Sequence, residues 1–147
     1  MKIRLLKPED IKSAYKIIKE NYPSKGWIKN APKELRAMFS DCAVKPKYFV
    51  AEQNNQIIGC AGYTQSWMDY DVYEIFWVNI KPNFQKMGIG SLLIKRLIKE
   101  IKSNKGARLI LLTTTIDEFY KKLGFKSLDI FDVDGFQLKY LDLQDRF

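Results

Sequence analysis

The sequence predicts an α/β (α+β) domain with a mixed, mostly antiparallel sheet. Two pairs of β-like runs are each separated by a short turn, at residues 54–55 and 134–135. Runs joined in this way form antiparallel hairpins. A third pair, at residues 73–80 and 108–112, is separated by a helical pattern. A strand–helix–strand unit makes its two strands parallel through a right-handed crossover, so we expect one parallel pair flanked by helices.

The first part of the chain predicts one strand and two helices. Residues 3–6 suit a short strand. Pro8 can occupy the first turn of a helix, and apolar residues then recur at spacings of three and four as far as Asn21. Residues 23–26 contain proline and glycine, which break this helix. A second helix is expected over residues 32–39, with Trp27 in the connection between the two.

The middle of the chain predicts the first hairpin, a further strand and a long helix. The hairpin strands are residues 48–52 and 57–65, and residues 73–80 form the next strand. The following helix should end at residues 104–106, where asparagine and glycine favour a stop. The apolar stripe expected on this helix is Ile89, Leu92, Leu93, Leu97 and Ile101.

The last part of the chain predicts a buried strand, a short helix and the second hairpin. The continuous apolar run at residues 109–112 is typical of a strand that is buried on both faces. Asp117 begins a helix that ends at Gly124, and residues 125–131 and 136–141 form the hairpin. Because we find no repeat and no linker, we expect a single domain over residues 1–147.

Composition excludes several classes of protein. Apolar residues make up 46% of the 147 residues, which suits a globular protein. The longest apolar runs are too short to span a membrane, and residues 1–7 lack the apolar core of a signal peptide, so we expect a cytoplasmic protein with no membrane partner. The chain has no histidine and two cysteines, which argues against a His-based triad, a zinc site or a disulfide framework. We therefore expect no metal.

The net charge of +8 has two interpretations. A lysine-rich surface keeps a protein soluble, and the charge here is spread along the chain rather than concentrated in a tail. Attraction to an anionic ligand is the alternative, since basic residues crowd after residue 86. Nucleic acid is not an expected partner, because the sequence lacks a stacking-platform motif.

A glycine-containing loop at residues 85–90 lies between a predicted strand and a predicted helix. The first N–H groups of a helix have no intrahelical acceptor and carry partial positive charge, which favours a phosphate there. A dinucleotide fingerprint fails because Leu93 stands at its third glycine, and a P-loop fails because Ser91 and Leu92 follow Gly90. Taken alone, the glycines favour an ordinary strand-to-helix turn.

The order of two motifs resembles the GNAT superfamily of N-acetyltransferases. Residues 85–90 match its cofactor motif, Gln/Arg-x-x-Gly-x-Gly/Ala, and residues 119–125 match its second signature, an aromatic-Tyr-x-x-Leu-Gly-Phe segment. The resemblance covers nearly the whole chain. It implies a sheet splayed at a central parallel pair, helices on both faces, and acetyl-CoA as the acyl donor.

The resemblance also implies which residues bind the cofactor. Backbone N–H groups of the glycine loop would bind the diphosphate, and the edge of the preceding strand would pair with the pantetheine. A threonine hydroxyl at position 114 or 115 would replace a family amide contact, although Thr115 fits a helix cap as well. Lys122 would approach the ribose phosphate or lie on the surface. The implied cofactor residues are Val78, Asn79, Ile80, Gln85, Lys86, Met87, Gly88, Ile89, Gly90, Ser91, Thr115 and Lys122.

Two residues are implied in catalysis by direct attack of a primary amine. An alkyl amine must lose a proton before it attacks, because its pKa is about 10. Glu74 stands where family members often carry a general base, and period two places it on one face with Phe76, Val78 and Ile80, partly desolvated. Tyr120 matches the family tyrosine that protonates the departing thiolate. A solvated strand-end glutamate and a core tyrosine are the corresponding structural interpretations.

The acceptor is left open by these motifs. A protein N-terminus, a lysine, a polyamine or another small amine all fit, and Trp27, Trp67 and Tyr70, with Met68, are the candidates for lining the acceptor pocket. We keep Cys60 as the alternative, covalent nucleophile. The other functions considered are a CoA-binding regulatory module without transfer activity and a basic nucleic-acid-binding protein. Either a monomer or a homodimer fits the sequence.

Overall fold

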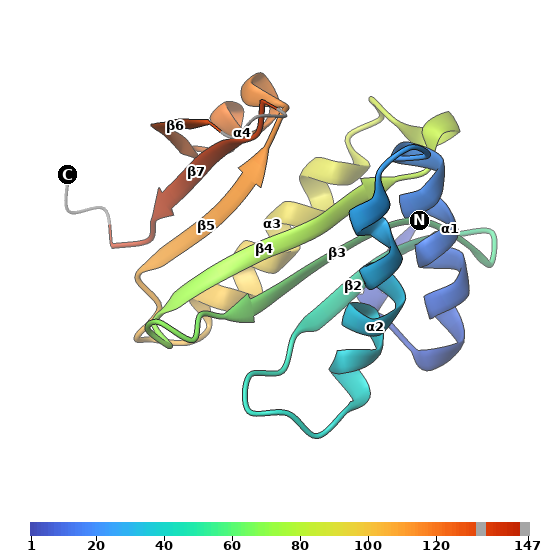
Figure 1. Ribbon diagram of the computed structural model, residues 1–147, viewed down its shortest axis with the longest axis horizontal. Helices are drawn as coiled ribbons and strands as arrows, with labels where there is room; N and C mark the ends of the chain where they lie inside the picture. The colour runs from blue at the N-terminus through green and yellow to red at the C-terminus, as the bar shows by residue number, and fades with distance from the viewer. Residues whose placement is uncertain (132–134, 145–147) are drawn as a thin grey trace.

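The computed structural model describes residues 1–131 and 135–144, and its strands form one seven-stranded sheet (Figure 1). The strand order is β1-β2-β3-β4-β5-β7-β6. The strands are β1 (Lys2–Leu5), β2 (Lys47–Gln53), β3 (Gln56–Gln65), β4 (Val72–Ile80), β5 (Leu109–Thr114), β6 (Lys126–Phe131) and β7 (Gln137–Asp142). The α-helices are α1 (Ile11–Asn21), α2 (Ala31–Arg36), α3 (Ile89–Lys102) and α4 (Asp117–Lys122).

Strand pairing confirms the predicted mixed sheet. β4 and β5 are parallel, and the other neighbouring strands of the described sheet are antiparallel. Asn54 and Asn55 both have positive φ, 52° and 58°, as a two-residue hairpin turn requires. Of the second predicted turn, Asp134 lies outside the described residues, and Gly135 has a φ of 81°.

Helices cover both faces of the sheet, as expected. Successive side chains of a strand point to opposite faces. On β2, Tyr48 and Val50 pack in one buried cluster with α1 and α2, whereas Phe49 and Ala51 pack in the other cluster with α3. Figure 1 shows α3 on the face opposite α1 and α2. The site described below lies where β4 and β5 stop pairing.

The helices differ from the prediction in two places. Leu92 is 46% exposed rather than part of the core stripe, and Ile94 is buried in its place. The line of Ile89, Leu93 and Leu97 is flanked by apolar residues on both sides, so the sequence did not show which side faces the sheet. Trp27 lies in a 3₁₀ helix, Gly26–Asn30, that leads directly into α2, and not in an irregular connection.

The β5 strand is buried less completely than predicted. Ile110 and Leu112 lie in the core cluster under α3, but Leu109 and Leu111 on the other face are half-buried. The helices α1 and α2 pack over β2 and β3 and not over β5, which leaves this face of β5 partly uncovered. A continuous apolar run therefore overstated the burial of this strand.

A bulge in β4 reverses the alternation of its side chains. The pairing of β3 with β4 joins Cys60 to Asn79 but Gly62 to Phe76, so β4 has one additional residue between these pairs. Trp77 has a φ of 50°, which non-glycine residues seldom adopt. An additional residue in one strand turns every later side chain to the other face.

This bulge contradicts the predicted face of β4. Val78 and Ile80 pack against the core cluster under α3, whereas Phe76 packs against the cluster under α1 and α2. Glu74 therefore shares a face with Phe76 but not with Val78 or Ile80. The prediction assumed an uninterrupted period of two, and no residue type in the strand signals the bulge.

Candidate active site

A cleft opens where β4 and β5 separate. These strands pair over three residues, ending at Glu74 and Leu111, after which β4 continues beside β3 and β5 beside β7. Figure 1 shows the two ribbons diverging. The cleft has a volume of about 580 Å³ and is lined by residues from both strands, from α2 and α4, and from the segment after α1. Parallel strands that separate in this way expose backbone groups of β4 that no neighbouring strand occupies.

The glycine loop forms the N-terminus of α3. Lys86 has a φ of 63° and Gly88 a φ of 84°, so the chain turns sharply before the helix begins. The first intrahelical bond runs from Leu92 N to Gly88 O at 3.1 Å. No side chain caps the helix, and its first turn holds no acidic residue. The preceding N–H groups of the helix are therefore available to an anion.

The side chain of Gln85 fastens this loop to β4 and α1. Its Nε2 donates to Asn21 Oδ1 and to Ile80 O, both at 3.0 Å. Asn21 Nδ2 in turn donates to Asn79 Oδ1 at 2.9 Å and to Ile80 O at 3.0 Å. Side chains at Gln85 and Asn79 are thus engaged in protein contacts, and the Gln85 N–H donates to Pro82 O at 3.3 Å.

Gly90 brings the two sequence motifs together. A Cβ at this position would lie 3.3 Å from Phe119 Cζ and 3.7 Å from Ile80 Cγ1. The first contact is tighter than nearly all Cβ contacts, so a glycine allows α4 to approach the first turn of α3. The motif at residues 119–125 therefore packs directly on the glycine loop.

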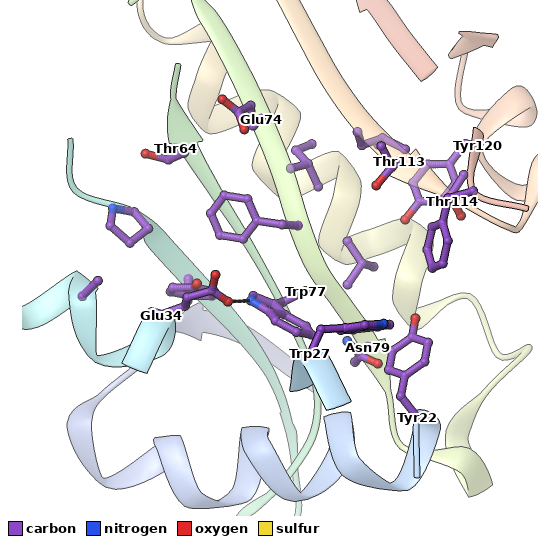
Figure 2. Close-up of a pocket in the computed structure, with 18 of the residues that line it drawn as sticks. Tyr22, Trp27, Glu34, Thr64, Glu74, Trp77, Asn79, Thr113, Thr114 and Tyr120 are labelled. Carbon is purple, nitrogen blue, oxygen red and sulfur yellow. Dashed lines mark hydrogen bonds between the residues drawn. The ribbon is translucent and has the colours of Figure 1, made fainter. Parts of the chain in front are cut away.

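Tyr120 faces the cleft from α4. Its side chain is 6% exposed, and its ring makes edge-on contacts with Phe119 and Phe125, with centroid distances of 4.8 and 5.7 Å. Burial, with the nearby Tyr22, raises the pKa of the Tyr120 hydroxyl above its ordinary value of 10.0. Figure 2 shows Tyr120 beside Thr113 and Thr114, with Tyr22 on the same side of the cleft. A phenol in this setting holds its proton at neutral pH.

Glu74 lies on the rim of the cleft and is exposed. The predicted partial desolvation is therefore wrong, because the apolar side chains that follow Glu74 along β4 pack into the layers on either face instead of around the carboxylate. Its neighbour across the sheet is Thr64. The carboxylate can exchange protons with water at this position.

The threonines before α4 differ in role. Thr114 Oγ1 accepts a hydrogen bond from Ile116 N at 2.9 Å, which closes the turn into the helix. Thr115 is exposed and lines the cleft, and α4 has no side-chain cap, so the alternative that Thr115 caps this helix is wrong. Lys122, at the end of α4, is exposed and lies outside the residues that line the cleft.

Two of the residues expected in the acceptor pocket line the cleft. Trp27 is 39% exposed, with its ring 5.1 Å from that of Tyr22 and 5.8 Å from that of Trp77. Trp67 is 74% exposed and lines the rim. Tyr70, 52% exposed, and Met68 belong to the same loop but do not line the cleft.

The cleft residues that sequence reasoning missed include Tyr22, Glu34 and Tyr48. Glu34 Oε2 accepts a hydrogen bond from Trp77 Nε1 at 2.7 Å (Figure 2). The two residues are 43 positions apart, so no local pattern could reveal this contact. A tyrosine within an apolar strand and one at the end of a helix are likewise typical of core residues.

Cys60 does not fit the role of a nucleophile. It is fully buried, its Sγ donates to Trp77 O at 3.5 Å, and it does not line the cleft. Burial raises the pKa of its thiol to about 12. Since the thiolate is the reactive form, a buried thiol of this kind is inert near neutral pH.

The described part of the chain contains no group of three or more His, Cys, Asp or Glu residues that could hold a metal ion. Over the same residues, none of the helices combines the length and the apolar character needed to cross a membrane.

Comparison with known proteins decides the family. Residues 11–125 match the model described as the acetyltransferase (GNAT) family. The chain belongs to this family. The resemblance drawn from the two motifs is therefore confirmed, and the sheet with one parallel pair is the fold of GNAT structures.

Relatives of this GNAT chain are similar over different lengths. An uncharacterised N-acetyltransferase of Methanocaldococcus jannaschii is 30% identical over 92 residues, which is 56% of this chain and 40% of that protein. The match covers less than two thirds of the length of each of the first curated relatives. Among solved structures, a GNAT-family acetyltransferase from Desulfovibrio desulfuricans superposes with a TM-score of 0.82 at 16% identity, covering 96% of this chain and 98% of the other.

A second solved structure contains the cofactor. The PaiA N-acetyltransferase from Thermoplasma acidophilum, in complex with coenzyme A, superposes with a TM-score of 0.72 at 21% identity. The comparison covers 97% of this chain and 99% of that one. At these identities the likeness concerns the fold.

Proposed function

We propose that this GNAT chain transfers the acetyl group of acetyl-CoA to a primary amine by direct attack of the amine. The observation that carries the proposal is the contact between the two motifs beside the cleft. Gly90 packs under Phe119, and the next residue, Tyr120, faces the opening between β4 and β5. A phosphate-binding turn and a proton donor are thus held within one rigid unit.

Acetyl-CoA fits the residues at this end of the cleft. The N-terminus of α3 has no capping side chain, and a Cβ at Gly88 would meet no atom within 4 Å, so the turn is open to a diphosphate. Val78 and Asn79 line the cleft on the part of β4 that has lost its parallel neighbour. An extended pantetheine arm can pair with such an edge as a peptide does. When bound, the thioester supplies an activated acetyl group.

Two side chains of the cleft would then transfer protons during the reaction. Glu74, open to water at the rim, would take a proton from the acceptor ammonium directly or through a water molecule. The Tyr120 hydroxyl, kept protonated because burial raises its pKa, would give its proton to the departing sulfur. The buried Cys60 leaves the cleft without a thiolate, which supports direct attack over a covalent acyl-enzyme.

The variant Tyr120→Phe tests this assignment, because it keeps the ring and removes only the hydroxyl. General acid catalysis contributes roughly 10²–10⁴-fold, so kcat should fall by at least about 100-fold while the Kd for CoA changes little. The assay is the release of CoA thiol from acetyl-CoA over a panel of amines and peptide N-termini. Tyr140→Phe, a half-buried tyrosine of β7 outside the cleft, is the matched control.

Full turnover by Tyr120→Phe would remove Tyr120 as the acid without touching the proposed reaction. Binding of CoA with no thiol release from any acceptor would instead favour a regulatory module without transfer activity. A wild-type protein that does not bind CoA would overturn the proposed function.

A further inference from the structure

One side of the cleft is acidic, although the protein is basic. The chain has 25 Lys and Arg residues and a net charge of +8. Among the described residues that line the cleft, however, the charged ones are Glu34 and Glu74, both negative. A concave site lined by charges of one sign concentrates counter-ions, so this acidic lining favours cations. The amine acceptor of the proposed reaction would bring a positive charge to the acidic side of the cleft.

Glu34 is held in position by an aromatic group. Trp77 Nε1 donates to its carboxylate at 2.7 Å, and the ring of Trp77 lies 5.8 Å from that of Trp27, tilted by 36°. Aromatic faces attract ammonium groups, particularly those of tryptophan. A carboxylate that an indole N–H holds in position, with aromatic rings nearby, can accept hydrogen bonds from a protonated amine.

Two buried hydroxyl groups at the cleft have no hydrogen-bond partner in the described structure. They are Tyr48 Oη and Thr64 Oγ1, and both residues line the cleft. Tyr48 is fully buried. Its pKa is raised mainly by burial and to a smaller extent by the charges of Glu34 and Cys60. Thr64 is the cross-strand neighbour of Glu74. Because buried polar atoms are nearly always paired, each of these hydroxyl oxygens can accept a hydrogen bond from a ligand in the cleft.

These acidic groups lie apart from the proton donor. In Figure 2, Glu34, Glu74 and Thr64 occupy the side of the cleft away from Tyr120 and Thr114. A single amine cannot lie at the thioester beside Tyr120 and also bind Glu34. Glu34 is therefore placed to bind a second positive charge on the same acceptor, while Glu74 takes the proton of the reacting amine.

We propose that the acceptor is a small aliphatic diamine whose second, protonated amine binds Glu34 beside Trp77. This inference rests on the proposed acetyl transfer. A cleft of about 580 Å³ suits a small molecule rather than a folded surface. Once the ammonium proton has passed through Glu74 to water, the neutral amine forms a C–N bond with the acetyl carbon and the C–S bond breaks. The nitrogen then loses one proton to Glu74, and the sulfur gains one from Tyr120, whose phenolate regains a proton from water. The products are a monoacetylated diamine and CoA thiol.

The experiment compares 1,4-diaminobutane with butylamine, which lacks the second amine. The ratio of kcat/KM for the diamine over that for butylamine should exceed about tenfold in the wild type and fall about tenfold in Glu34→Gln, as expected for a charged hydrogen bond. Glu20→Gln, an exposed glutamate of α1 outside the cleft, should leave the ratio unchanged. Thermal unfolding confirms that each variant is folded.

Calorimetry separates binding from turnover, with 1,4-diaminobutane titrated into the protein in the presence of CoA. Diamine binding that weakens in Glu34→Gln supports the cation site, whether or not an amine is acetylated. If the diamine binds in this way but no amine is acetylated, only the proposed acetyl transfer is overturned. Equal kcat/KM for the two amines, or a ratio that Glu34→Gln does not change, overturns the diamine and leaves acetyl transfer standing. Glu34-dependent binding of a basic peptide but not of the diamine also overturns it.

A second variant covers the case in which Glu34→Gln does not fold. Trp77→Phe keeps the carboxylate and an aromatic ring but removes the indole N–H that positions Glu34. It should lower the selectivity ratio severalfold, and an unchanged ratio counts against the proposal.

Discussion

Replacing Gly88 with alanine tests the backbone geometry on which the site depends. Gly88 has a φ of 84°, in the left-handed region where a Cβ costs about 1–2 kcal/mol. A Cβ there meets no atom within 4 Å, so no steric clash adds to this cost. For a domain of this size each kcal/mol lowers Tm by about 2–4 °C, which gives an expected loss of about 2–8 °C.

Gly26 provides the matched control for Gly88. A Cβ at Gly26 also meets nothing within 4 Å, but its φ lies outside the left-handed region. Gly26→Ala should therefore stabilise the fold by about 0.4–1 kcal/mol, because alanine restricts the unfolded chain. Gly88→Asn should cost less than Gly88→Ala, since asparagine tolerates positive φ. Scanning calorimetry of the three variants measures these differences.

The same variants report on the proposed cofactor site. If the N–H groups after Gly88 bind the diphosphate, Gly88→Ala should weaken CoA binding in calorimetric titrations while Gly26→Ala does not. Equal Tm values for the two alanine variants would refute the left-handed turn, and with it the expectation that α3 presents its N-terminus to a phosphate.

Three further predictions concern stability. Tyr48→Phe should leave Tm unchanged or raise it, because the hydroxyl it removes is buried without a partner. Lys139 is 1% exposed and donates a hydrogen bond to Asp117, so Lys139→Ala should lower the free energy of unfolding in urea by about 2–4 kcal/mol. Lys139→Met, which keeps the volume of the side chain, should lower it less. Burial raises the pKa of Asp10, but the hydrogen bonds from Arg4 and from the Lys7 N–H, together with the charges of these two residues, outweigh it and hold the pKa below 3.8. This pair should thus stabilise the fold fully above pH 3.8 and progressively less as the pH falls through the lowered pKa, a loss that Asp10→Asn should not show.

The predictable part of the fold came from local signals. Residues 54–55 specify a tight turn through their own backbone preferences, and the helix after Gly88 follows from an apolar repeat within one segment. The parallel pairing of β4 and β5 follows from the handedness of a crossover, which is a general property of chains. The bulge at Trp77 was not predictable, because it depends on the register that β3 imposes on β4.

The candidate site divides in the same way. The sequence by itself determined the family, the glycine turn and the tyrosine, because each is written in a short run of neighbouring residues. Only the tertiary structure decided which side chains face the cleft: it joined Glu34 to Trp77 across 43 positions and left Glu74 in solvent. Such contacts arise when separate helices and strands pack together, and the secondary-structure propensities of single residues do not determine that packing. The proposed acceptor side of the cleft is made of these contacts, so we expect acceptor selectivity to depend on the folded protein.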